Sequence, residues 1–181
     1  MKVAICEYGA GNVRSVRLAF ARLGVTEVAD VRGADLAVVP GVGSARAAMA
    51  GLRARGHDDA VRDRFEAGRP ILGICLGLQL ALDETEEDGG VDGLGLVPGR
   101  AVRLRHGRVP RIGWAPVEGR GAFYFAHSYA AETPHAVSWS EDVVAEVRHG
   151  PFVGCQFHPE KSGAAGAAYL QEVAASCRSL A

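Results

Sequence analysis

The length, composition and charge of the chain indicate an ordinary globular protein. It has 181 residues, of which 48 % are hydrophobic and 23 % charged, the balance of a folded rather than a disordered or fibrous protein. This length suits one domain covering residues 1–181. With 20 basic and 21 acidic residues the formal net charge is -1, so no broad cationic field exists to hold nucleic acid or an anionic membrane. We expect neither as a partner.

The first residues and the cysteines indicate the compartment and the redox chemistry. The apolar run after Met1 ends at Glu7, too early for a signal peptide or a membrane span, so a cytoplasmic location is expected. The four cysteines include no CxxC pair, which predicts free thiols and argues against a disulfide framework and a zinc site. They are Cys6, Cys75, Cys155 and Cys177. We expect neither a metal nor a cofactor.

Short apolar runs alternate with helical patterns in the first half of the chain. Strands are expected at 3–6, 25–28, 36–39 and 71–74, and helices at 13–23, in the alanine-rich segment after Gly43, and at 76–82. Strands that are apolar on both faces and alternate with helices predict a parallel sheet with helices on both sides. The first half is therefore expected to be α/β.

The pattern changes after Gly89, where glycines break up the chain. Short β-type runs follow at 102–104, 123–125 and 143–147, then a strand at 152–157 and a closing helix at 163–178. We expect the short runs to be antiparallel additions to the same sheet. No linker, repeat or low-complexity tract divides the chain.

Cys75 is the first candidate catalytic residue. It stands between a buried strand and a helix, with Gly73 and Gly77 two residues to either side. This is the cysteine form of a nucleophile elbow, a sharp turn that exposes the nucleophile at the carboxyl end of a sheet. The start of the following helix favours the reactive thiolate. A buried core cysteine is the alternative, and it is the interpretation kept for the other three cysteines.

His158 and Glu160 are the second element. Proline at 159 disfavours helical backbone at His158, and side chains two apart on an extended segment point the same way. We therefore expect the two to act together, the imidazole moving the proton of a thiol and the carboxylate orienting the imidazole. A surface histidine without a catalytic role is the alternative.

The segment Pro40 to Gly43 follows another strand at the same end of the sheet. Its glycines permit backbone N–H groups to point into a shared crevice, as an oxyanion hole requires. Taken alone, a PGxG segment indicates only a loop.

Three strings in this order resemble the signature motifs of the class I glutamine amidotransferases: PGVGS at 40–44, GICLGLQL at 73–80 and QFHPEKS at 156–162. Further strings resemble, more narrowly, the glutaminase subunits of imidazole glycerol phosphate synthase: EYGAGN at 7–12, IGW at 112–114, YFAHSY at 124–129 and HPEKSG at 158–163. The resemblance spans nearly the whole chain. It implies a flavodoxin-like α/β fold, with a mostly parallel sheet, helices on both faces and antiparallel additions.

The resemblance also implies an activity and a partner. Glutamine would be the substrate, and Cys75 would form a thioester that water hydrolyses to glutamate. Ammonia would pass through a tunnel to a cyclase subunit with a (β/α)8 barrel, in a heterodimer that makes imidazole glycerol phosphate in histidine biosynthesis.

Residue roles follow by matching motif positions. Cys75, His158 and Glu160 would be catalytic, and the oxyanion donors would be the Leu76 N–H and a reoriented amide near Val42. The residues implied to surround glutamine are Gly43, Gln79, Glu87, Ser128 and Tyr129. Those implied to face the cyclase are Asn12, Trp114, Tyr124 and Lys161.

The chain departs from the family pattern in two places. Family members commonly carry histidine where this chain has Arg111, and they usually have a longer stretch between Leu104 and Val109. Both departures lie on or near the expected partner surface, so they concern docking rather than hydrolysis.

Other classes of protein fit the sequence less well. A dinucleotide-binding protein would need glycine where Arg14 stands in the GxGxxG pattern. A cysteine peptidase would leave Gln79, Trp114 and Lys161 without a role. The glutaminase of pyridoxal phosphate synthase typically shows PGGES in place of PGVGS. A binding-only relative without activity would have no reason to keep all three catalytic residues.

Overall fold

The computed structural model describes residues 1–9 and 13–178 of the protein. Asn12, expected to face the partner, lies outside the described residues. Among those described, no helix combines the length and apolar character needed to cross a bilayer.

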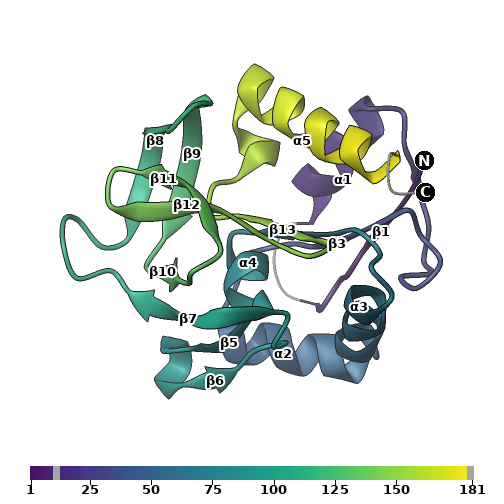
Figure 1. The fold of residues 1–181 in the computed structure, drawn as a ribbon, viewed down its shortest axis with the longest axis horizontal. Helices are drawn as coiled ribbons and strands as arrows, with labels where there is room; N and C mark the ends of the chain where they lie inside the picture. The colour runs from purple at the N-terminus through teal and green to yellow at the C-terminus, as the bar shows by residue number, and fades with distance from the viewer. Residues whose placement is uncertain (10–12, 179–181) are drawn as a thin grey trace.

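A seven-stranded sheet occupies the centre of the molecule (Figure 1). Its spatial order is β11-β12-β13-β4-β3-β1-β2, in which β13 to β2 run parallel and β11 and β12 are antiparallel additions. The parallel part, β2-β1-β3-β4-β13, has the flavodoxin-like order, which confirms the expected fold class. The strands are β1 (Lys2–Ile5), β2 (Thr26–Glu27), β3 (Leu36–Val39), β4 (Ile71–Ile74), β11 (Ala136–Ser140), β12 (Val143–His149) and β13 (Phe152–Cys155).

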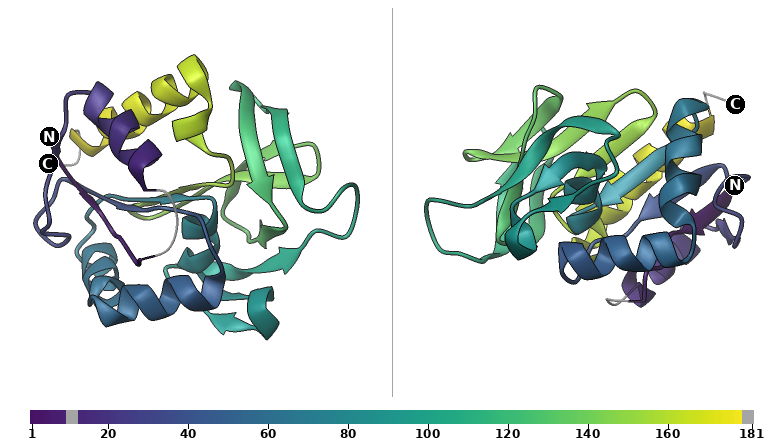
Figure 2. Two further views of the ribbon diagram at one scale, coloured as in Figure 1. Left: turned by 180° about the vertical axis from the view of Figure 1, so that it is seen from behind. Right: turned by 90° about the horizontal axis from the view of Figure 1, so that it is seen from below.

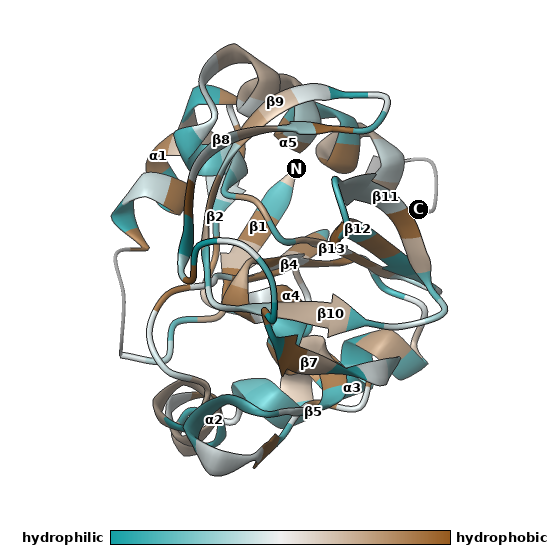
Figure 3. Cartoon of the chain, turned by 90° about the vertical axis from the view of Figure 1, so that its left-hand side faces the viewer, coloured by the Kyte–Doolittle hydropathy of each residue, from teal (hydrophilic) through white to brown (hydrophobic). Residues whose placement is uncertain are grey.

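Helices cover both faces of this sheet (Figures 1 and 2). On one face lie α1 (Arg14–Arg22) and α5 (Gly163–Arg178), and on the other α2 (Ala45–Ala54), α3 (His57–Glu66) and the short α4 (Leu76–Ala81). Successive residues of a strand point to opposite faces, so Val3 and Ile5 join one hydrophobic core and Ala4 the other. The central strands are coloured mostly as hydrophobic for this reason (Figure 3).

Two smaller sheets are formed mainly by the second half of the chain. The first has the order β10-β7-β5-β6, and the second pairs β8 with β9. Their strands are β5 (Leu82–Thr85), β6 (Val91–Asp92), β7 (Val97–Arg103), β8 (Arg111–Val117), β9 (Gly121–His127) and β10 (Tyr129–Glu132). Two 3-10 turns, η1 (Glu87–Gly89) and η2 (Pro159–Lys161), complete the described elements.

The expectation that every short β-type run joins the central sheet was correct for 143–147 and wrong for 102–104 and 123–125. The first run lies at the end of β7, where Val102 and Arg103 pair with β10. The earlier part of β7 pairs with β5. In β9, Phe123 turns its ring toward Phe157 and Tyr169, so this strand covers α5 and the sheet's end rather than extending an edge. The helix expected at 76–82 ends at Ala81 because Leu82 begins β5.

Arg64 of α3 ties together the chain segments that lead into β3 and β4. Its side chain is only 1 % exposed, and its guanidinium donates to the carbonyl oxygens of Val31 (2.9 Å), Ala34 (2.7 Å) and Pro70 (2.7 Å). Burial lowers its pKa from the ordinary value. The two strands that carry the candidate site are thereby fixed at their starting ends.

Replacing Arg64 with methionine should destabilise the protein by about 3 kcal/mol, because buried carbonyl oxygens lose their donors at about 1–3 kcal/mol each. Denaturant unfolding measures this difference. Arg32→Met is the control: that side chain is 58 % exposed and, within the part of the chain that the structure describes, pairs with Asp63, so its loss should cost less than about 1 kcal/mol. Equal losses in the two variants would contradict this role of Arg64.

Candidate active site

Cys75 occupies the turn between β4 and α4, as the sequence predicted. Its backbone has φ 51° and ψ -106°, a conformation that residues other than glycine rarely adopt and that is found mainly at functional sites. The Cys75 N–H donates to the Cys155 carbonyl oxygen of β13 at 2.7 Å. The neighbouring parallel strand therefore fixes this strained turn.

The loop after β3 packs directly against the Cys75 turn. A Cβ atom placed on Gly41 would lie 1.8 Å from the Ile74 carbonyl oxygen, and one on Gly77 would lie 2.0 Å from the Val39 carbonyl oxygen. No side chain fits at either contact. The glycines of the two motifs thus allow two stretches of backbone to meet at the carboxyl ends of β3 and β4.

A cavity of about 340 Å³ opens at this place. It brings together most of the residues that the sequence singled out: Val42, Gly43, Cys75, Leu76, Gln79, Glu87, Ser128, Tyr129, His158 and Lys161 all line it. Glu160 is not part of the lining, and neither are Trp114 and Tyr124. Segments from both halves of the chain therefore form one site.

His158 lines this cavity, and the Glu160 carboxylate orients its imidazole. Its Nδ1 is 2.8 Å from Glu160 Oε1, and the two side chains are 2 % and 4 % exposed. The backbone of His158 is extended, with φ -102° and ψ 91°, as expected. The expected reason for the pairing was wrong, however, because Glu160 belongs to the turn η2 and not to an extended segment.

The electrostatics of His158 favour its protonated form. Burial opposes charge on the imidazole, but hydrogen bonds with the Cys75 sulfur and the Glu160 carboxylate outweigh it and raise the pKa to about 9. Since Nδ1 faces Glu160, the Nε2 side is left for the sulfur. The arrangement is that of a sulfur beside an imidazole that a carboxylate supports.

The other three cysteines are free and buried, as expected. Burial raises the pKa of Cys6 to about 12, and it also raises the pKa of Cys155 and of Cys177. These thiols lack the activating surroundings of Cys75. The core interpretation is confirmed for them.

The buried Tyr8 hydroxyl binds the backbone of residues 40–43, the glycine loop. The sequence did not predict this role. Its hydroxyl accepts a hydrogen bond from the Val42 N–H at 3.0 Å and lies 2.9 Å and 3.1 Å from the carbonyl oxygens of Val42 and Pro40. In this conformation the Val42 N–H points to Tyr8. Burial raises the pKa of Tyr8 to about 12, so the hydroxyl stays neutral.

Two further polar residues were quoted within motifs but given no role. Gln156 is fully buried beside Cys75, with Nε2 3.5 Å from the sulfur. His127 lines the cavity, and its Nδ1 lies 2.8 Å from the Tyr129 carbonyl oxygen. Burial lowers the pKa of His127 to about 4, so it is neutral. The signal in the sequence was the polar Gln156 in an apolar strand, two residues before His158 and hence on its face.

The residues expected to face a partner lie beside the cavity on β8, β9 and η2. Trp114 is 59 % exposed and meets the ring of Tyr124 edge-on, with centroids 6.3 Å apart. The Lys161 ammonium lies 5.9 Å from the same ring. Ile112, 64 % exposed, extends this apolar surface.

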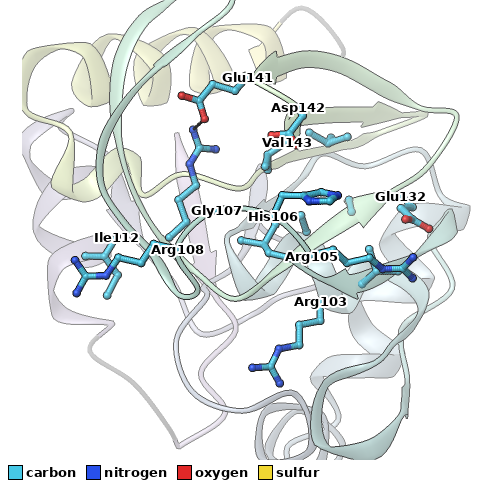
Figure 4. A pocket seen from close by; sticks show the side chains of 16 residues that line it. Arg103, Arg105, His106, Gly107, Arg108, Ile112, Glu132, Glu141, Asp142 and Val143 are labelled. Atoms are coloured by element: carbon cyan, nitrogen blue, oxygen red, sulfur yellow. Dashed lines mark hydrogen bonds and ion pairs between the residues drawn. The ribbon is translucent and has the colours of Figure 1, made fainter.

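A second cavity of about 480 Å³ adjoins this surface and shares Ile112 with the first. Arg103, Arg105, His106 and Arg108 surround it (Figure 4). Arg111, expected from the sequence to depart from the family pattern, also lines it. Its guanidinium donates to Ser140 and Glu141 and lies over the ring of Phe125, so the substitution is accommodated within the protein.

Within residues 1–9 and 13–178, no group of three or more histidine, cysteine or acidic side chains is placed to hold a metal ion.

Comparisons with known proteins agree with this geometry. The family model "Glutamine amidotransferase class-I" matches residues 13–176. A solved structure described as a glutamine amidotransferase has a TM-score of 0.76 and 25 % identity, over 96 % of this chain and 98 % of that one. The chain belongs to the class I glutamine amidotransferases.

Curated relatives narrow the family. The chain is 43 % identical to "Imidazole glycerol phosphate synthase subunit HisH" of Mycolicibacterium paratuberculosis, over 93 % of this chain and 95 % of that protein. It is 39 % identical to "Imidazole glycerol phosphate synthase hisHF, chloroplastic" of Arabidopsis thaliana, over 93 % of this chain but 33 % of that protein. Within its class, the chain thus belongs to the HisH subunits of imidazole glycerol phosphate synthase.

The raised pKa of His158 can be tested by following its ring carbons in NMR spectra as a function of pH. The wild type should titrate near pH 9, and Cys75→Ala and Glu160→Gln should each lower this value, because each removes a group that favours the imidazolium. Because the folded pKa exceeds the ordinary 6.5, charging of His158 stabilises the fold below pH 6.5. That contribution disappears as the pH rises through about 9. Titration of the wild-type residue near 6.5 would refute the arrangement.

Proposed function

We propose that this protein hydrolyses glutamine to glutamate and ammonia at Cys75 and supplies the ammonia to a cyclase subunit that makes imidazole glycerol phosphate. The observation that carries the proposal is the meeting of Cys75 and His158 in one cavity, with the imidazole of His158 bonded to the Glu160 carboxylate at 2.8 Å. The names of the HisH relatives support imidazole glycerol phosphate as the product of the complex.

The chemistry follows from these three groups. The Cys75 thiolate attacks the side-chain carbonyl carbon of glutamine, and His158 delivers a proton to the amide nitrogen as the C–N bond breaks. Ammonia leaves, and a thioester remains. His158 then takes a proton from water, the resulting hydroxide attacks the thioester, and glutamate departs as the sulfur is released. Glu160 orients the imidazole and stabilises its charged form throughout.

The oxyanion of each tetrahedral intermediate needs backbone donors. We assign this role to the Leu76 N–H at the start of α4 and to a Val42 amide reoriented toward the cavity. The Val42 N–H now donates to Tyr8, so the loop has to turn before this donor becomes available. One such donor typically contributes about 10²–10³ in rate. The bond to Tyr8 would therefore hold basal activity low.

Gly43, Gln79, Glu87, Ser128 and Tyr129 would surround glutamine. Their place in the cavity lining supports this. The Glu87 carboxylate accepts a hydrogen bond from the Ala45 N–H at 3.0 Å, which fixes it at the rim. A fixed carboxylate suits the ammonium group of an amino acid substrate.

The partner would bind the exposed apolar surface on β8 and β9. Trp114 and Tyr124 lie there, and Lys161 lies beside them in η2, next to the cavity through which ammonia would leave. The family resemblance adds Asn12 to the proposed contacts. The Arabidopsis relative supports a two-part enzyme, because this chain matches only 33 % of it. We propose that the partner is a (β/α)8 barrel and that the complex is a heterodimer.

The test is glutamate release from glutamine, measured with and without the cyclase subunit and its ligand. Turnover should depend on the partner, and Cys75→Ala should lower it by about 10³-fold or more, because the nucleophile is lost. Cys177→Ala is the control, since this thiol lies in α5 away from the cavity. Hydrolysis of peptides instead of glutamine would favour a peptidase. Full activity in Cys75→Ala would exclude the mechanism.

Tyr8→Phe should raise hydrolysis without the partner by about fivefold, since the resting loop loses hydrogen bonds to the hydroxyl that contribute about 1 kcal/mol. The rate is measured as glutamate released by the isolated subunit. Tyr169→Phe removes another buried hydroxyl, which lies in α5 and outside the cavity lining, and should leave the rate unchanged. Lower basal activity in Tyr8→Phe would mean that Tyr8 supports the active rather than the resting loop.

A further inference from the structure

We propose that Gln156 is a positioning residue of the active site, which donates a hydrogen bond from its side-chain amide to the Cys75 sulfur and is oriented for this by Gln79. The inference rests on the proposed role of Cys75 as the nucleophile.

Gln156 lies immediately after β13, in contact with both residues. Its side chain has no exposed surface. Its Nε2 is 3.5 Å from the Cys75 sulfur, and its Oε1 accepts a hydrogen bond from Gln79 Nε2 at 3.1 Å. The Gln156 backbone is also fixed, because its N–H donates to the Ala145 carbonyl oxygen of β12 at 2.9 Å.

The orientation of both amides follows from one carbonyl group. The Tyr129 carbonyl oxygen lies 2.8 Å from the amide end of Gln79, and a carbonyl oxygen can only accept. Gln79 must therefore present its nitrogen there. The same nitrogen also donates to Gln156, so the atom that Gln156 presents to it must be the oxygen, an acceptor. The Gln156 nitrogen therefore points at the Cys75 sulfur.

A donor at this place favours the anionic form of the sulfur. Hydrogen bonds to the charged form of a group stabilise that form, and bonds to an ion are about twice as strong as bonds between neutral groups. His158 also stabilises the thiolate, but it must give up its proton when ammonia leaves. The Gln156 amide keeps its proton, so it supports the sulfur at every stage of the cycle.

The same chain of bonds fixes which atom Gln79 offers to the substrate. Both N–H groups of Gln79 are used, one by Tyr129 and one by Gln156. Only its Oε1 is left for the cavity that Gln79 lines. An acceptor here favours a donor group on the substrate, and glutamine carries such groups in its amide and its ammonium.

Space filling alone does not explain a glutamine at this position. The neighbouring Cys155 and Phe157 are apolar and fully buried, and an unpaired amide in such surroundings costs about 1–3 kcal/mol. A leucine or methionine would fill similar volume without that cost. The polar side chain is therefore explained by what its two ends contact.

The test is the pH dependence of Cys75 alkylation by iodoacetamide, followed by mass spectrometry of the peptide that contains it. Gln156→Met keeps the size but removes the donor, and Gln156→Glu keeps the acceptor for Gln79 but places a carboxylate at the sulfur. Both should move the midpoint of alkylation upward by about one pH unit, since each loses a group that favours the thiolate. Both should also lower the rate of glutamate release by about tenfold or more.

Ser138→Ala is the matched control. Ser138 lies in β11 of the same sheet, is 6 % exposed and donates one hydrogen bond to the Glu118 carbonyl oxygen. This variant should leave the alkylation midpoint unchanged, so a shift in the Gln156 variants could not reflect general loosening. Unshifted midpoints in folded Gln156→Met and Gln156→Glu would overturn the inference. Alkylation needs neither glutamine nor a partner. If the Gln156 variants shift the alkylation midpoint but the wild type shows no glutaminase activity, the proposed function is refuted and the role of Gln156 beside the Cys75 sulfur stands.

Discussion

The contact between the glycine loop after β3 and the turn at Cys75 is the constraint on which the site depends. The Cys75 backbone is strained, and the short distance from Gly41 to the Ile74 carbonyl oxygen leaves no room for a side chain. Two parallel strands end side by side there, and β13 supplies the hydrogen bond that fixes the turn. The proposed nucleophile and the loop that carries the proposed oxyanion donor are thereby held in contact.

Around this contact, buried polar side chains form hydrogen bonds that lead to Cys75 and His158. Gln79 and Gln156 connect the Tyr129 carbonyl group to the Cys75 sulfur, while Glu160 supports His158 from the other side. These hydrogen bonds limit the cost of removing the four side chains from water. The sulfur thus has an imidazole on one side and an amide donor on another.

We propose that the conformation of the glycine loop links the chemistry of Cys75 to partner binding. Tyr8 accepts the Val42 N–H, so in this conformation the loop is not arranged as an oxyanion hole. The exposed apolar surface at Trp114 lies beside the same cavity. A partner bound there could favour the turned loop only by contacts that differ between the two conformations.

The amino-acid sequence by itself determined the parallel sheet with helices on both faces, the elbow at Cys75 and the pairing of His158 with Glu160. These are local features, because hydrophobic runs, close-packed glycines and short spacings act within a few residues. It also placed one of the antiparallel additions correctly, at 143–147. Only the tertiary structure decided that 102–104 and 123–125 belong to separate sheets, because strand partners far apart in the chain are chosen by packing.

The roles of Tyr8 and Gln156 were likewise decided only by the tertiary structure. Tyr8 meets Val42 across 34 positions of the chain, and Gln156 meets Cys75 across 81. No spacing rule reaches that far. Each of these two hydrogen bonds forms only where folded strands bring the partners together, and the ends of the strands depend on the packing of the whole sheet.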